Sequence, residues 1–411
     1  MTPRRFRRGG GDTIKGHLTL EEIAADFARH ETELAERAAA AGLTRREFLC
    51  AAAAGAALAT GASGAAEVAA GAESNSPAAS VGAALAAGAS AAEVVSPPRN
   101  EADVSPPRER RVSPEPESPA APAAGSDKQV AARSRVVVVT HPEVLLKEYR
   151  VNPAVVRQML DRAVTDLTGA KDETAAWRQF GRAGDFVAIK HNSIGRPTLH
   201  SHTEINDAVA AQLAACAQVK PDRILAVDRT VPPPYDELSA PFTLPTRGLE
   251  TRLRRLYTEQ ATAIVNVGVL KSHGMVGLSA ALKNHLGSIN NPAAYHYWEP
   301  DRLPRNVPEL NALAPIRTKT RLVIIDAIRP LFAGGPFDDP QYRWDYRGLI
   351  VSTDPVAAEA VGMRILEAKR AESRKGPWPM TAARLMVAYA QEIGLGNADA
   401  DRIDLVEAKM G

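Results

Sequence analysis

Cysteine is almost missing from this sequence of 411 residues, which contains only Cys50 and Cys216. Cys50 lies in an alanine-rich stretch near the amino terminus, so Cys216 is alone in the rest of the chain. A single thiol can form neither an internal disulfide nor a Cys-ligated zinc site or iron–sulfur cluster. The sequence therefore excludes these centres from the folded part, and we interpret Cys216 as a small buried apolar residue.

The sequence also lacks an excess of charge of one sign and several common binding motifs. The 50 basic and 48 acidic residues leave a net charge of +2, so no overall field attracts nucleic acid or an anionic membrane. No Gly-x-Gly-x-x-Gly follows a predicted strand, and the chain has no Walker loop, no Gly-x-Ser-x-Gly and no His-Glu-x-x-His. The ordinary dinucleotide-binding, P-loop and hydrolase classes therefore have no support.

Long strongly hydrophobic runs are also lacking, although paired arginines near the amino terminus precede a mildly apolar stretch. Residues 44–49 read Thr-Arg-Arg-Glu-Phe-Leu, and alanine- and glycine-rich residues 50–66 follow. This pattern resembles a bacterial twin-arginine export signal, and it falls short of the roughly 20 strongly apolar residues of a spanning helix. We expect a signal region over residues 1–72, passage through the twin-arginine translocase to the periplasm or cell envelope, and no stable transmembrane anchor. An uncleaved membrane tether is the alternative.

Residues 73–130 are rich in Pro, Ser and Ala and contain almost no large apolar side chains. Such a composition cannot bury enough surface to offset the entropy of an ordered chain. We therefore expect a disordered linker, followed by one folded domain over residues 131–411.

Continuous apolar runs alternate with helical patterns in this domain, which is typical of an α/β fold with a mostly parallel sheet flanked by helices. The predicted strands are residues 135–140, 185–190, 223–228, 263–270, 321–326 and 348–352. The predicted helices are residues 153–167, 203–217, 248–259, 276–287 and 355–369. Asp354 and Pro355 suit the cap and the first position of the last helix. Residues 230–246 and 290–315 are predicted to be long loops that could act as lids.

Charged or polar residues end nearly every predicted strand. Because the carboxyl ends of parallel strands share one edge of the sheet, these side chains are expected to converge there. Several cations in one cleft repel each other unless an anion is bound, so the pattern favours a phosphate, carboxylate or nucleotide ligand. The predicted ligand-binding residues here are Lys190, Asn192, Arg229, Lys271 and, through their backbone amides, Gly334 and Gly335. Alternatively, each charge merely marks the point where a strand reaches water.

Residues 271–283 form the most informative segment, because they bring a His and a Lys to the end of the 263–270 strand. The side chain of His273 titrates near neutrality, and Gly277 would let a ligand approach the backbone. In the alternative interpretation, this is an ordinary strand–helix turn whose His and Lys face solvent. Two further histidines, His200 and His202, could bind metal only if the chain between them is extended.

The order of these segments resembles that of the DUF362 family, a family of domains of unknown function, over roughly residues 136–366. The resemblance rests on residues 187–192, 201–204, 264–274, 280–284, 323–328, 334–336 and 352–356. Members often carry a ferredoxin-like module, which this chain lacks, and the family implies no settled reaction.

A more distant resemblance to the lactate racemase family lies in the order of His273, Gly277, Ser279 and Lys283. In that family the Lys covalently holds a nickel-bearing pyridinium dinucleotide, and the His moves a proton at the substrate carbon. The resemblance implies Lys283 as a cofactor anchor, His273 as an acid/base, and Gly277 and Ser279 beside the cofactor. It also implies a downstream metal-ligating His, for which His296 or His285 is the nearest candidate.

Together these patterns predict an exported enzyme, isomerase- or oxidoreductase-like, that acts on a small anionic, carboxylate-bearing molecule. His273 would be the acid/base and Lys283 a cofactor anchor or anion ligand, with His202 and Asp326 as further catalytic residues. The cofactor would be a metal or nucleotide-type group. The alternative is a non-catalytic envelope protein that binds an anionic solute or cofactor.

Overall fold

The structure, a computed structural model, describes residues 39, 42 and 133–411 except 247, 275 and 297–301. The side chains of residues 296, 302 and 303 also lie outside this description. The predicted signal region (1–72) and linker (73–130) therefore fall almost wholly outside the described residues, which belong almost entirely to the domain after them.

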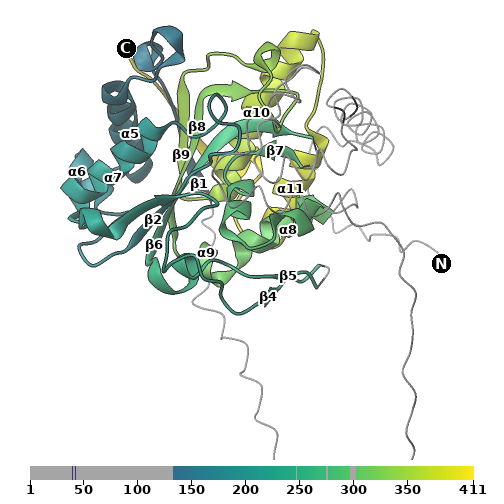
Figure 1. The fold of residues 1–411 in the computed structure, drawn as a ribbon. Coiled ribbons are helices and arrows are strands. Elements are labelled where there is room, and N and C mark those ends of the chain that lie inside the picture. The colour runs from purple at the N-terminus through teal and green to yellow at the C-terminus, as the bar shows by residue number, and fades with distance from the viewer. Residues whose placement is uncertain (1–38, 40–41, 43–132, 247, 275, 297–301) are drawn as a thin grey trace, which may run out of the picture. The chain divides into compact units, whose positions relative to one another are not determined.

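One mixed sheet of eight strands forms the centre of the domain, in the order β10-β1-β9-β8-β6-β2-β3, with β7 paired to β6 (Figure 1). The strands are β1 Ser134–Thr140, β2 Val187–Lys190, β3 Ile224–Val227, β6 Ala263–His273, β7 Gly277–Ser279, β8 Thr320–Leu331, β9 Gly348–Ser352 and β10 Ile403–Lys409. A separate ribbon contains β4 Phe242–Thr243 and β5 Glu250–Thr251. Parallel pairs join β10 to β1, β8 to β6, β6 to β2 and β2 to β3, whereas β9 runs antiparallel to both neighbours. The predicted α/β architecture with a mostly parallel sheet is confirmed.

Helices cover both faces of this sheet (Figure 1). One layer contains α5 Pro153–Thr168, α6 Glu173–Trp177 and α7 Thr203–Ala217; the other contains α8 Arg302–Ala312, α9 Ala314–Arg317, α10 Pro355–Arg374 and α11 Thr381–Glu392. Successive strand residues point to opposite faces, so Val137 packs in the core under α5 whereas Val138 packs in the core under α10. The strands are therefore buried on both sides, which explains their unbroken apolar runs.

The predicted start of α10 is confirmed. The Oδ1 atom of Asp354 accepts the backbone N–H groups of Val356 at 2.8 Å and Ala357 at 3.0 Å, and Pro355 is the first helical residue. The cap satisfies amides that have no partner inside the helix.

The helix predicted over residues 276–287 is wrong. Strand β6 continues to His273, the chain turns back, and β7 pairs antiparallel with it; a 3₁₀-helix, Lys283–Ser288, comes next. Gly277 has a φ of +76°, outside the helical region. Buried side chains bind the amides of Ala281 and Leu282, so long-range contacts replace the internal bonds of a helix here.

Two other predicted segments also differ. Residues 248–259 form no continuous α-helix. They contain β5 and most of a short π-helix, Leu256–Gln260, and between the two Leu253 forms a β-bridge with Ile289. The predicted loop 290–315 contains α8 and α9, although α8 includes Pro308. The buried side chains of Val307 and Leu310 offset the amide that the proline lacks. Among the described elements, α6, α11 and β10 lie in stretches for which the sequence analysis predicted no element.

Unequal strand lengths create the place where the functional side chains meet. Strand β2 ends at Lys190 opposite Asn266, whereas β6 continues to His273. Between Asn266 and Lys271, that side of β6 has no partner among the described strands, and from Lys271 to His273 it pairs with β7. In this gap the Oγ atom of Ser201, from the loop of residues 191–202, donates to Val267 O at 2.8 Å and takes the place of a bond between strands.

Candidate functional site

A buried ion pair between Lys190 and Asp228 lies at the carboxyl ends of β2 and β3. The Nζ atom of Lys190 is 2.6 Å from Oδ1 of Asp228, and it also donates to Asn284 Oδ1 at 3.2 Å. Lys190 is fully buried and Asp228 is 5% exposed. Burial raises the pKa of Asp228, but the Lys190 ammonium and hydrogen bonds from Ser193 outweigh it and bring the pKa to about 2. The predicted strand-end residues thus meet, although this ammonium is neutralised by the protein itself.

Gly287 lets the turn after β7 approach this pair. A Cβ atom at Gly287 would lie 2.6 Å from Asp228 Oδ1 and 2.7 Å from Lys190 Nζ, closer than real contacts allow. A side chain here would therefore separate the two charges or displace the turn.

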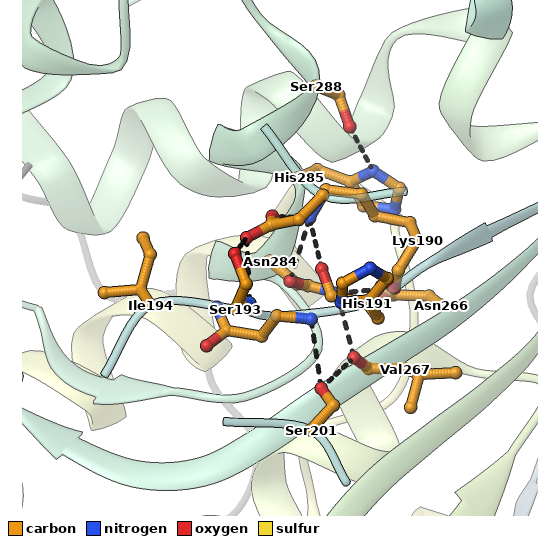
Figure 2. Close-up of polar contacts among 12 residues, drawn as sticks. Lys190, His191, Ser193, Ile194, Ser201, Asn266, Val267, Asn284, His285 and Ser288 are labelled. Carbon is orange, nitrogen blue, oxygen red and sulfur yellow. Dashed lines mark hydrogen bonds and ion pairs between the residues drawn. The ribbon is translucent and has the colours of Figure 1, made fainter. Parts of the chain in front are cut away.

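Asn284 joins this turn to two strands (Figure 2). Its Nδ2 atom donates to Asn266 Oδ1 at 2.7 Å and to Lys190 O at 2.8 Å. Asn266 in turn donates to Ala281 O at 2.9 Å. These buried amides satisfy one another, so the turn that carries Lys283 has a fixed position against β6.

Lys271 is the second buried ammonium of the site. Its Nζ atom donates to Asn192 Oδ1 at 3.1 Å and to Ile194 O at 2.9 Å, and the residue is 2% exposed. Burial and the nearby charge of Lys283 lower the pKa of Lys271 to about 7. Lys271 is held by neutral acceptors, unlike Lys190, so its charge is not cancelled by a contacting carboxylate.

Lys283 is partly buried, and its amine has no hydrogen bond or ion pair with the described residues. Burial and the charge of Arg229 both lower its pKa, to about 8. Arg229 likewise has no carboxylate partner within the described part of the chain. Two neighbouring cations without a counter-ion destabilise each other unless an anion binds between them.

A cleft with a volume of about 360 Å³ lies beside Arg229. Its described lining consists of Ser193, Ile194, Arg229, Thr230, Arg254, Ile289, Asn290 and Pro292. This described lining contains two guanidinium groups, the hydroxyls of Ser193 and Thr230, and no carboxylate. The Nε atom of Arg254 has no hydrogen-bond partner among the described residues. The cleft can therefore accept an anionic group.

His202 and Asp326 form a hydrogen-bonded pair on the α5–α7 side of the sheet. The Nδ1 atom of His202 lies 2.6 Å from Oδ2 of Asp326, which also accepts the backbone N–H of His202 at 2.9 Å. Asp326 is 2% exposed, and its Oδ1 atom accepts from Ile328 N. Burial lowers the pKa of His202, but the carboxylate outweighs this effect and the net pKa is raised. A carboxylate that fixes one imidazole nitrogen leaves the other to transfer protons.

His273 lies at the end of β6, two residues after Lys271, so the two side chains project from the same face of the strand. His273 is 4% exposed and is paired with Gly277 in the β6–β7 hairpin. Ser279 is opposite Lys271 in the same hairpin. The described lining of the cleft includes neither His273 nor Lys283; Lys283 is linked to the cleft through Arg229.

The backbone of the 334–336 turn makes contacts with β6. The N–H of Gly335 donates to Ser272 Oγ at 3.0 Å, and a Cβ atom at Gly335 would lie 1.8 Å from Ser272 O. Gly335 thus allows close packing against β6, and its amide already has an acceptor.

The histidines predicted as metal ligands are not assembled into a metal site in the described residues. His285 is 1% exposed, packs edge-on against Tyr257 and has its Nδ1 atom 3.4 Å from Ser288 Oγ. The side chain of His296 lies outside the described residues. His200 and His202 contact different oxygens, and no described group of three His, Cys, Asp or Glu residues could hold a metal ion. The nickel-bearing cofactor therefore stays a prediction, and no step proposed below depends on it.

Sequence reasoning missed several polar residues that build the site. Asn266, Asn311 and Glu359 are buried polar groups inside apolar helical or strand patterns, and that interruption is the signal that could have identified them. Arg254 and Ser193 lie in loops with no pattern to mark them.

Residues 249–364 match the family described as domain of unknown function (DUF362). The match covers β6, β7, the Lys283 turn, Asp326 and the first half of α10. The DUF362 resemblance expected from the sequence over roughly residues 136–366 is thus confirmed for residues 249–364. No curated protein and no solved structure matches the chain. None of the helices in the described residues combines the length and apolar character needed to cross a membrane.

Proposed function

We propose that the domain is an enzyme that acts on a small anionic molecule, with a carboxylate or phosphate group bound near Lys283 and Arg229. The observation that carries the proposal is the pair of neighbouring cations, both without a counter-ion in the described residues, beside a cleft that contains Arg254 and no carboxylate. Lys271 adds a third cation near Lys283. A bound anion would relieve this repulsion, and guanidinium groups match the geometry of carboxylate and phosphate oxygens.

Proton transfer is the step that the chain's own residues could perform. His202 is oriented by Asp326 at 2.6 Å, and His273 lies on the same strand face as Lys271. Removal of a proton from a carbon of the bound anion and its return to the same or a neighbouring carbon would fit an isomerase-like reaction, which balances without a further reactant. The charge of Lys271 would favour negative charge that develops on the substrate.

Anion binding is tested by calorimetry with inorganic phosphate and citrate as probes on the full chain. Lys283→Met and Arg229→Met should each weaken binding at least about tenfold, since each removes an interaction worth about 1.4 kcal/mol or more. Lys369→Met is the matched control, because it removes a cation that pairs with Glu372 on the far part of α10. Equal affinity in all four proteins would contradict the proposal.

A non-catalytic binding protein is the second candidate, and the absence of His273 from the described lining of the cleft favours it. The two are separated by incubating the protein with small carboxylic and phosphorylated acids in deuterium oxide and following their carbon-bound protons by NMR. Exchange or conversion that is lost in His202→Asn or His273→Asn supports the enzyme. Tight binding without any exchange supports the binding protein.

Export through the twin-arginine pathway is part of the proposal and rests on residues 44–49. Fractionation of a twin-arginine-competent bacterial host should place the protein in the cell envelope. Replacement of Arg45 and Arg46 by Lys should retain it in the cytoplasm. The same distribution for both proteins would count against export by this route.

A further inference from the structure

The two peptide units before Lys283 are held by buried side chains from three different elements. One carboxylate oxygen of Glu359 in α10, Oε2, accepts the N–H of Ala281 at 2.7 Å and of Leu282 at 2.9 Å. Asn266 of β6 donates to Ala281 O at 2.9 Å. Asn311 of α8 donates to Leu282 O at 2.8 Å. All four backbone polar groups of these residues thus have side-chain partners.

These side-chain hydrogen bonds replace the backbone hydrogen bonds that an α-helix would form within itself. The turn also packs directly on β6, since a Cβ atom at Gly268 would lie 2.3 Å from Ala280 O. The backbone at 280–282 therefore cannot shift toward the strand, and its amides cannot rotate without losing Glu359. The backbone conformation immediately before Lys283 is therefore fixed.

Glu359 is an energetically unfavourable residue in this position. It is fully buried, and its other oxygen, Oε1, has no hydrogen-bond partner among the described residues. Its neighbours in α10, Ala358 and Ala360, belong to the apolar core under this helix. Burial raises the pKa of its carboxyl to about 7, although the two N–H groups oppose the shift. An apolar residue would fit this core better unless the contact with the turn is needed.

We propose that Glu359 is a positioning residue for the anion site: by holding the Ala281 and Leu282 amides, it directs Lys283 toward Arg229. Glu359 touches no ligand and acts only through the turn. The inference rests on the proposed function, because it assigns Glu359 to the same anion site, but the contacts that support it are independent of the ligand's identity.

The test compares full-length Glu359→Gln and Glu359→Leu by calorimetry with inorganic phosphate. Gln retains a carbonyl oxygen that can accept both N–H groups, so its affinity should stay within about twofold of the unsubstituted protein. Leu leaves both amides unpaired and should weaken binding at least about tenfold. Glu367→Leu is the matched control: Glu367 is also on α10 and accepts a backbone N–H, that of Met380 at 2.8 Å, away from the turn.

A second measurement follows the reactivity of the Lys283 amine and needs no ligand. Acetylation rates are measured by peptide mass spectrometry for Lys283 and, as an internal reference, for Lys369. The Lys283 rate should change at least threefold in Glu359→Leu and return in Glu359→Gln. A loss of stability alone would give the same change in Glu367→Leu and no recovery in Glu359→Gln, and that result would overturn the inference.

The outcomes separate the two proposals. Normal phosphate binding and an unchanged Lys283 rate in Glu359→Leu overturn the positioning role and leave the anion site intact. Absence of phosphate and citrate binding in the unsubstituted protein contradicts the proposed function, and the acetylation rates still decide the role of Glu359. If Glu359→Leu does not fold, Asn311→Leu removes the contact to Leu282 O from α8 and is expected to change the same rate.

Discussion

His202 and Asp326 are 124 positions apart in the chain, yet Nδ1 of His202 lies 2.6 Å from Oδ2 of Asp326. The loop after β2 brings His202 to the amino terminus of α7, directly over the carboxylate that β8 buries. The same oxygen accepts the backbone N–H of His202 at 2.9 Å, so both the ring and the chain are fixed by one side chain.

Replacing this carboxylate should lower the pKa of His202. Burial alone lowers it, and the charge of Asp326 produces the net rise, so Asp326→Asn removes the opposing effect. NMR titration should show the His202 imidazole titrating at lower pH in the variant than in the unsubstituted protein. His285, whose pKa burial lowers to about 3, should show no change and serves as the reference. An unaltered His202 titration would contradict the assigned pairing.

Breaking the buried pair at the centre of the site should be strongly destabilising. Lys190→Met leaves Asp228 buried without its ammonium, and such a change typically costs about 3–5 kcal/mol of unfolding free energy. The exposed pair of Arg135 and Asp404, 2.8 Å apart, provides the control, since Arg135→Met should cost about 1 kcal/mol or less. Denaturant unfolding measures both, and similar losses would show that burial does not decide the difference.

Gly287 should tolerate no side chain. In Gly287→Ala the added Cβ would lie within 2.8 Å of both Lys190 and Asp228, so the variant should lose about 1–3 kcal/mol of stability. Gly184→Ala meets no atom within 4 Å and is the matched control, with an expected change close to zero. Thermal unfolding of the two variants makes the comparison. Equal midpoints would show that the turn can move away from the ion pair.

Glu359 should make stability depend on pH between its unfolded and folded pKa values. The folded pKa is raised from 4.5 to about 7, so the folded state holds this proton more tightly than the unfolded state. The stabilisation that this tighter proton binding gives the folded state is therefore fully present below pH 4.5. It is lost as the pH rises through about 7, which lowers the unfolding free energy by about 3 kcal/mol. Glu359→Gln should lack this loss. Parallel stability–pH curves for the two proteins would disprove it.

The fold was largely predictable because its main elements follow local rules. Continuous apolar runs marked six strands, and helical spacing together with the cap at Asp354 marked α5, α7 and α10. The prediction failed where distant groups determine the backbone. Residues 276–287 have apolar residues at helical spacing, but Glu359 and Asn311 bind that backbone from elements remote in sequence.

The same limit applies to the site. The ends of parallel strands can be located from the apolar pattern of the sequence, so the convergence of Lys190, Lys271 and Asp228 could be expected. The sequence could not predict which of the two lysines is neutralised, because that depends on the partner that each side chain contacts in the folded domain. Lys190 contacts Asp228 at 2.6 Å, whereas Lys271 contacts only neutral oxygens. The pairing of His202 with Asp326 is equally invisible to local patterns, although both residues stood among the predicted ones.

The unequal lengths of β2 and β6 separate two tasks within one strand. Up to Asn266, β6 pairs with β2 along this border. Residues 267–270 have no described strand partner there and contact side chains instead, and β7 pairs with β6 from Lys271 onward. Substitutions in residues 191–202 can therefore change the surroundings of Lys271 while the pairing of β6 with β8 is unchanged.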